Sequence, residues 1–334
     1  MPQLTRRSLL SIAAAVPVFT WGAAAPAQPV RRPTVVNGRR FRHYDVFTDK
    51  PLAGNQLAVF METAGLSAAE MQAMTRETKF SECTFVQPPE TAGTDVRLRI
   101  FGPANEMQFA GHPVIGSAFA LADEGGIAAG RKEFTFGLGI GPTLVELEWQ
   151  SDRLQFAWMT QQKPVYGATL DAPAALAAAL GLEASAMRAG VLPQEVNCGS
   201  PFFFVPLASR AAVDQAVADQ RAIAAVFEAA KVTRRGLFIF STEPGADGAT
   251  AYSRMMGANE DPATGSASGP LGCYLVKHGL VPPDKAGSIV SSQGVKMGRP
   301  SRIHIKLDVN GTEVTRVRVG GTSVLVGEGW LRSS

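Results

Sequence analysis

The chain contains 334 residues, enough for one large domain or for two domains of about 150 residues each. Hydrophobic residues make up 46% of it and charged residues 18%, a globular composition that excludes an intrinsically disordered protein. The 32 Lys and Arg residues exceed the 29 Asp and Glu residues by only three, which is too small a basic excess for a protein that grips nucleic acid.

Residues 1–27 predict a twin-arginine export signal. Arg6 and Arg7 precede a modest apolar segment, which ends in the A-x-A cleavage pattern Ala25-Pro26-Ala27. A transmembrane anchor is the alternative, but Pro17 interrupts the segment, and the segment is shorter than the roughly 20 apolar residues that a membrane span requires. We therefore expect cleavage near Ala27, a periplasmic or secreted protein, and no membrane contact after cleavage.

Cysteine and histidine are too scattered to predict a disulfide framework or a metal site. Cys83, Cys198 and Cys273 are isolated in the sequence, so no pairing can be predicted. The four histidines lie far apart, without a Cys or His companion at ligand spacing. The chain also lacks the G-x-x-x-x-G-K-[ST] phosphate loop and a G-x-G-x-x-G turn between a strand and a helix. We expect neither a metal nor a cofactor.

The first predicted domain, residues 41–155, consists of short strands and two helices. Strand patterns occur at residues 43–48, 55–61, 80–86 and 96–101. Ser67 and Glu70 have the spacing of a capping box and predict a helix that ends near Thr78. From Pro113, a residue suited to the start of a helix, to Ala122 the chain is apolar all round and rich in small residues, which predicts a helix buried on every side.

The second predicted domain, residues 156–320, repeats this arrangement. Asp261 precedes a second helix of small residues, which runs to His278 with Gly279 as its C-cap. We expect outer amphipathic helices at residues 171–186 and 211–231. Strands are expected in six segments: residues 202–207, 236–240, 251–256, 288–292, 301–306 and 313–319. A C-terminal strand near residues 322–332 is expected to complete the first domain.

These patterns predict an α+β fold of two pseudo-repeated domains. A helix that is apolar on all sides needs a sheet wrapped around it. We therefore expect each domain to be an open β-barrel around its own central apolar helix.

The two buried helices begin at glycine steps, Gly111-His112 and Gly265-Ser266. Unpaired amides at a helix start bind anions, and glycine lets a ligand approach the backbone closely. Both steps are candidate clamps for a substrate carboxylate. The alternative is that these glycines only permit tight packing of helix against sheet, and spacing alone does not decide between the two.

Glu82 is the candidate for proton transfer. It lies in the apolar strand at residues 80–86, on the same face as Phe80 and Thr84. Burial there would raise its pKa from about 4.3 toward the 6–7 that suits a general base. The alternative is a glutamate on an edge strand that points at water. By itself Asp261 would be an N-terminal cap of the following helix, and His112 likewise a capping group.

Four strings carry a family resemblance: residues 45–55 (Asp-Val-Phe-Thr-Asp-Lys-Pro-Leu-Ala-Gly-Asn), 81–86 (Ser-Glu-Cys-Thr-Phe-Val), 110–116 (Ala-Gly-His-Pro-Val-Ile-Gly) and 260–267 (Glu-Asp-Pro-Ala-Thr-Gly-Ser-Ala). In this order and spacing they resemble the PhzF family, which is named for an isomerase of phenazine biosynthesis. The resemblance implies the fold of diaminopimelate epimerase, with two similar barrels, an active site between them and usually a homodimer.

The resemblance also implies roles for the candidate residues. Glu82 matches the catalytic glutamate, which takes a proton from one carbon and returns it to another. Gly111 and Gly265 match the amide clamps of the family. His112, Asp261 and Ser266 match the family residues that orient the substrate. The epimerase branch has a cysteine before each glycine, whereas this chain has Ala110 and Thr264 there, which favours glutamate over thiol chemistry. Gln56 and Gly102 depart from the usual family residues, so the substrate is less certain than the type of reaction.

The sequence thus predicts a cofactor-independent isomerase that acts on a small carboxylate. An exported binding or sensing protein that keeps the clamps without chemistry is the alternative, although a binding protein has no need for a buried base. A serine or cysteine hydrolase is less favoured, because no catalytic triad stands at a recognisable spacing. The substrate itself is not determined.

Overall fold

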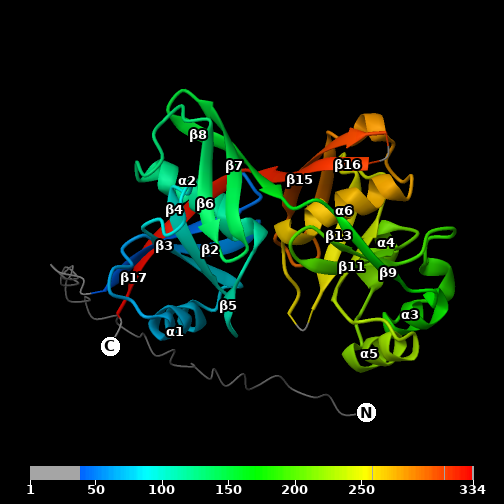
Figure 1. Ribbon diagram of the computed structural model, residues 1–334. Helices are drawn as coiled ribbons and strands as arrows, with labels where there is room; N and C mark the ends of the chain where they lie inside the picture. The colour runs from blue at the N-terminus through cyan, green and yellow to red at the C-terminus, as the bar shows by residue number, and fades with distance from the viewer. Residues whose placement is uncertain (1–37, 258, 312, 333–334) are drawn as a thin grey trace, which may run out of the picture. The chain divides into compact units, whose positions relative to one another are not determined.

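A computed structural model describes residues 38–257, 259–311 and 313–332, which belong to one compact unit (Figure 1). The predicted export signal at residues 1–27 lies outside the described residues. In the part of the chain that is described, no helix is long and apolar enough to cross a membrane.

The described strands form one continuous hydrogen-bonded sheet that curls into two groups. The first group contains β1 (Arg39–Val46), β2 (Asn55–Phe60), β3 (Glu82–Gln87), β4 (Val96–Phe101), β5 (Glu106–Met107), β6 (Glu133–Leu138), β7 (Gly141–Gln150), β8 (Arg153–Gln161) and β17 (Ser323–Leu331). The second contains β9 (Val165–Thr169), β10 (Gln194–Asn197), β11 (Pro201–Pro206), β12 (Gly236–Ser241), β13 (Ala251–Met256), β14 (Ile289–Gln293), β15 (Ser301–Asn310) and β16 (Glu313–Gly321).

Each group surrounds one helix. The first packs around α2 (Gly111–Asp123), where Val114, Ile115 and Ala118 are completely buried. The second packs around α6 (Gly265–Lys277) and has a core of its own. Figure 1 shows one of these helices inside each group. The predicted fold, an open barrel around a central apolar helix in each half, is confirmed by this arrangement.

Two strand pairings connect the halves of the chain. The chain leaves the first group along β8, which pairs antiparallel with β16. The last strand, β17, returns to the first group and pairs antiparallel with β1, from Arg39 opposite Leu331 to Val46 opposite Ser323. Strand β1 ends at Val46 because Phe47 has a φ of 64° and turns the chain away.

Helix α1 (Ala68–Thr78) has the expected capping box of Ser67 and Glu70 and ends where the sequence predicts. The outer helices of the second half are shorter than the sequence predicts. The segment expected as a helix at residues 171–186 contains only α3 (Pro173–Ala179) and the 3₁₀ turn η1 (Ala184–Ala186), because the chain turns at Gly181 with a φ of 67°. The segment expected at residues 211–231 is split into α4 (Arg210–Gln215) and α5 (Gln220–Ala229), since the side chain of Asp219 caps a new helix. A second 3₁₀ turn, η2, spans Pro283–Lys285.

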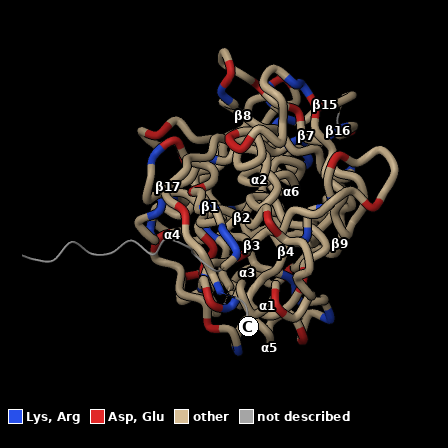
Figure 2. Tube along the Cα trace, turned by 90° about the vertical axis from the view of Figure 1, so that its left-hand side faces the viewer, with Lys and Arg blue, Asp and Glu red and all other residues tan. Residues whose placement is uncertain are grey.

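The two central helices start against each other, at Gly111 and Gly265. A Cβ atom added to Gly111 would lie 2.5 Å from the carbonyl carbon of Gly265 and 2.6 Å from the amide nitrogen of Ser266. Real Cβ atoms do not approach backbone so closely, so only glycine permits this contact. Charged residues of both signs are spread mainly over the outer segments in Figure 2, away from the two central helices.

We predict that Gly111→Ala lowers the free energy of unfolding by roughly 1–3 kcal/mol, the usual cost of overpacking. Urea denaturation followed by circular dichroism measures this loss. The matched control is Gly287→Ala, because a Cβ at Gly287 meets nothing within 4 Å. Equal stability of the Gly111→Ala and Gly287→Ala proteins would contradict the proposed close contact.

Candidate active site

A cavity of about 310 Å³ lies beside the meeting point of α2 and α6. The N-cap residues of these helices are Ala110 and Thr264, and neither caps its helix with a side-chain hydrogen bond. The first amides of both helices therefore have no side-chain cap, and together with the helix dipoles they favour an anion. The cavity is lined by all six residues selected from the sequence: Glu82, Gly111, His112, Asp261, Gly265 and Ser266.

Glu82 begins β3 and faces the helix inside the first barrel. It shares this face with Thr84, whose hydroxyl lies 2.9 Å from the hydroxyl of Ser117 on α2. Strand β3 pairs with β2 on one side and β4 on the other, so the alternative of an edge-strand glutamate in water is wrong. The side chain of Glu82 is 17% exposed, and its Oε2 atom is buried without a hydrogen-bond partner.

Burial shifts the pKa values of Glu82 and His112 in opposite directions. It raises the pKa of Glu82 to about 7, against a smaller lowering by the Ser81 hydroxyl. It lowers the pKa of His112 to about 4, although Asp261 acts to raise it. His112 Nε2 lies 3.3 Å from Glu82 Oε2. Because the imidazole is neutral near pH 7, this contact is not an ion pair, and both atoms remain available to a ligand.

Asn55, the first residue of β2, connects the two barrels at this site. Its Nδ2 atom lies 3.2 Å from His112 Nδ1 and donates to Asp261 Oδ1 at 2.6 Å and to the carbonyl oxygen of Ala263 at 3.0 Å. Ser81 Oγ donates to Asn55 Oδ1 at 3.1 Å, which sets the orientation of the amide. Because the two protons of Asn55 Nδ2 go to Asp261 and Ala263, this pattern holds the imidazole of His112 beside Asn55, with Nε2 toward Glu82, and leaves its tautomer open.

Asn55 was not selected from the sequence as a functional residue. It stands in one of the strings that carry the family resemblance, but its role depends on Asp261, which is distant in the chain. No local pattern shows this partnership.

Asp261 lies before α6 and is not its N-cap, which is Thr264. Thr264 Oγ1 donates to Asp261 Oδ2 at 2.6 Å, and Gln293 Nε2 donates to the Asp261 carbonyl oxygen at 2.7 Å. Burial, with a further contribution from the nearby Glu82 carboxylate, raises the pKa of Asp261 to about 6. The sequence alternative of a simple helix cap is therefore wrong, and Asp261 belongs to the buried polar cluster.

The remaining lining has acidic and apolar parts. Its carboxyl groups are those of Glu82, Asp261 and Glu260, and Glu260 forms an ion pair with Arg254 at 2.8 Å. Among the residues that the structure describes, no Lys or Arg side chain lines this cavity. Apolar surface comes from Pro103, Met107, Ala110, Phe202 and Met255. Among the described residues, no group of three His, Cys, Asp or Glu side chains is arranged to hold a metal.

The three cysteines do not belong to this site. All are buried free thiols, and the sulfur atoms of Cys198 and Cys273 lie 3.9 Å apart.

A family model described as phenazine biosynthesis-like protein matches residues 44–329. The chain belongs to this family, PhzF. The PhzF chain is 36% identical to trans-2,3-dihydro-3-hydroxyanthranilate isomerase of Pseudomonas aeruginosa over 291 residues, which cover 87% of this chain and 98% of the relative. The resemblance predicted from the sequence is confirmed, and several named relatives of the chain are isomerases.

Solved structures confirm the fold of this PhzF chain. A PhzF-family phenazine biosynthesis protein of Bacillus anthracis superposes with a TM-score of 0.77 at 23% identity, covering 89% of this chain and all of that one. A probable proline racemase of Agrobacterium radiobacter superposes with a TM-score of 0.62 at 12% identity, covering 89% and 93%. At these identities the two structures establish the diaminopimelate epimerase-like fold alone.

The raised pKa of Glu82 predicts how stability depends on pH in this PhzF protein. The folded state holds the proton of Glu82 more tightly than the unfolded state, so this contribution to stability is complete below pH 4.5 and is lost as the pH rises through about 7. We expect the free energy of unfolding to fall between pH 5 and 8 by up to about 3 kcal/mol more in the wild type than in Glu82→Gln.

Urea denaturation at several pH values between 5 and 8 measures this difference. The exposed Glu183 provides the control, because Glu183→Gln should keep the wild-type dependence on pH. Parallel pH profiles for the wild type and Glu82→Gln would mean that Glu82 titrates as it does in the unfolded chain.

Proposed function

We propose that this chain is a cofactor-independent isomerase that shifts a proton within a small carboxylate-bearing substrate, with Glu82 as the single acid and base. One observation carries the proposal. Glu82 Oε2 and His112 Nε2 are buried, lie 3.3 Å apart, have no hydrogen-bond partner and line a cavity at two helix starts. Buried polar atoms without partners are costly, and a substrate would supply the missing contacts.

In this proposal the substrate carboxylate binds at the helix starts. The first amides of α2 and α6, at Gly111 and Gly265, donate hydrogen bonds to it, and the positive ends of both helix dipoles add to the attraction. Since the described lining contains no Lys or Arg, the main-chain amides are its anion-binding groups. His112, Asp261 and Ser266 then contact the rest of the substrate.

The proton shift uses Glu82 twice. Its carboxylate form removes a proton from a carbon made acidic by a neighbouring carbonyl, imine or diene, and the electron pair left behind is delocalised over that group. Protonated Glu82 then returns the same proton to another carbon of the substrate, so no second reactant is needed. A pKa near 7 lets Glu82 act in both directions at neutral pH. The neutral His112 presents Nε2 to the substrate, where it can form a hydrogen bond with a polar group beside the reacting carbons.

The composition of the cavity suggests the chemical class of the substrate. Asp261 offers an acceptor for an amino or hydroxyl group, while Phe202 and Met255 offer apolar surface for a small ring or chain. By its name, the relative from Pseudomonas aeruginosa acts on trans-2,3-dihydro-3-hydroxyanthranilate, which has these groups. We therefore propose this compound as the first substrate to test.

We predict that Glu82→Gln lowers kcat for isomerisation by at least about 100-fold, because general acid–base catalysis contributes roughly 10²–10⁴-fold. The amide keeps the size of the side chain, so substrate binding should remain. The assay follows trans-2,3-dihydro-3-hydroxyanthranilate in H2O and in D2O, with Glu183→Gln as the control. A shielded intramolecular transfer should incorporate less than one deuterium per turnover.

Two results would contradict this proposal. Wild-type activity in Glu82→Gln would show that another group moves the proton. Tight binding by the wild type without isomerisation or hydrogen exchange, over a panel of small amino acids and hydroxy acids, would favour the alternative of an exported binding or sensing protein.

We also propose that residues 1–27 direct twin-arginine export and that the mature protein acts in the periplasm as a homodimer. The motif at Arg6 and Arg7 and the cleavage pattern ending at Ala27 support export. Arg6→Lys with Arg7→Lys keeps the charge but removes the motif, so the protein should stay in the cytoplasm in cell fractionation. Sedimentation of the mature chain measures its molecular mass in solution and so tests whether it is a homodimer. Unchanged export of the double variant would contradict the twin-arginine route.

A further inference from the structure

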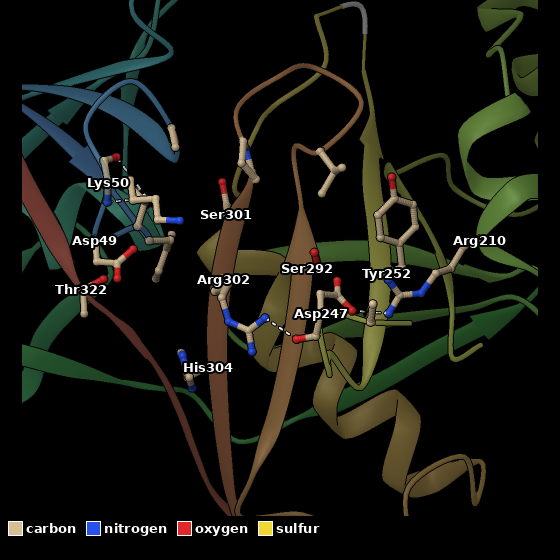
Figure 3. A pocket seen from close by; sticks show the side chains of 16 residues that line it. Asp49, Lys50, Arg210, Asp247, Tyr252, Ser292, Ser301, Arg302, His304 and Thr322 are labelled. Carbon is tan, nitrogen blue, oxygen red and sulfur yellow. Dashed lines mark hydrogen bonds and ion pairs between the residues drawn. The ribbon is translucent and has the colours of Figure 1, made fainter. Parts of the chain in front are cut away.

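A second cavity, of about 600 Å³, lies between the first barrel and strands β13–β15 of the second (Figure 3). One wall is the connection between β1 and β2, from Phe47 to Ala53. The opposite wall includes Tyr252 on β13, Arg302 on β15 and Asp247 in a loop. Its volume falls within the range of roughly 300–1,000 Å³ that is typical of small-molecule sites. None of its lining residues lines the candidate active site.

The charged groups of this cavity leave a positive excess. Arg210 and Asp247 form an ion pair at 2.8 Å and cancel each other. The remaining charged residues of the lining are one anion, Asp49, and two cations, Lys50 and Arg302. Figure 3 shows Lys50 extending from the first wall toward β15, and Arg302 directed toward Asp247, where its Nη1 donates a 2.8 Å hydrogen bond to the carbonyl oxygen.

Lys50 has no such restraint. Within the described residues its ammonium group makes no side-chain hydrogen bond or ion pair, so it is available to an incoming anion.

The uncharged lining has an apolar part, from Phe47, Ala53, Ala246, Tyr252, Val295 and Pro300, and a polar part, from Thr48, Ser292, Ser301, His304 and Thr322. Val295 is 43% exposed although it is a large apolar side chain, so an apolar ligand would cover surface that now faces water. The cavity therefore fits an anion with an apolar body. The candidate active site has the opposite charge, since its lining, as far as the chain is described, has three carboxyl groups and no Lys or Arg.

Phe47 separates the two cavities. Its ring lies so close to the start of α6 that a Cβ on Gly265 would be 2.8 Å from Cζ of the ring. The backbone of Phe47 has a φ of 64°, which is strained for a bulky residue, and it is held by hydrogen bonds to Thr322 and from Arg302. A ligand in the second cavity would thus contact the residue that supports one of the proposed carboxylate clamps.

We propose that this cavity is a second ligand site, which binds a small organic anion with an apolar body, such as an aryl carboxylate, between Lys50 and Arg302. The anionic group lies between the ammonium and the guanidinium, and the ring lies against Val295 and Pro300. This site is distinct from the isomerase site proposed above and does not depend on it.

Photoaffinity labelling of the mature chain with 4-azidobenzoate tests the proposal. We expect saturable labelling within residues 47–53, 246–252 and 292–304, and competition by excess benzoate. Lys50→Met and Arg302→Met keep an unbranched apolar side chain and remove the charge. Each should raise the probe concentration at half-saturation about 5-fold, because an exposed ion pair contributes at most about 1 kcal/mol. Ala246→Trp should fill the cavity and abolish labelling there.

The control is Lys163→Met, since Lys163 is exposed and does not line the cavity. Each variant is first checked for wild-type thermal unfolding. If Arg302→Met fails to fold, Lys50→Met decides, because the Lys50 side chain bonds to no described residue. Three results would overturn the proposal: no saturable labelling, labelling confined to the candidate active site at residues 81–82, 111–112 and 255–266, or labelling by Lys50→Met equal to that of Lys163→Met. Because the readout is the labelled peptide, failure of the isomerase proposal would not affect it.

Discussion

The structure depends on a backbone contact between two glycines, where the N-termini of α2 and α6 meet. Any side chain at Gly111 would collide with the backbone of Gly265, so the two helix starts approach each other only because both residues lack a Cβ. Neither helix is capped by a side chain. The result is a pair of uncapped, positively polarised helix ends beside one cavity, which no single helix would supply.

Burial then assigns different tasks to neighbouring side chains. Glu82 and Asp261 bind protons more readily than usual, and His112 less readily, because the charged form of each loses solvation in the same apolar surroundings. Asn55 holds this cluster together across the two barrels. Near pH 7 His112 is therefore neutral, Asp261 is mostly ionised and Glu82 is about half ionised, so the buried cluster carries a net negative charge.

Local patterns predicted the fold where the residues of a single element show whether that element is buried. The all-round apolar helix near Gly111 required a surrounding sheet, and the box of Ser67 and Glu70 marked a helix start. Prediction was weaker where tertiary contacts dominate. Strands β5 to β10 were not selected from the sequence, although β7 and β8 alternate buried and exposed positions. The Ala-rich outer segments look like continuous helices, but their ends depend on packing at Gly181 and on a new cap at Asp219.

The sequence by itself determined the family, the α+β class and six residues of the candidate site, because these depend on short strings and on residue types with restricted uses. Only the tertiary structure decided that Glu82 is buried in a central strand and not exposed at an edge. It also decided that Asp261 is a partner of Asn55 and not a helix cap. Both outcomes depend on segments far apart in the chain, and the free energy of burial is a property of such contacts and not of local sequence.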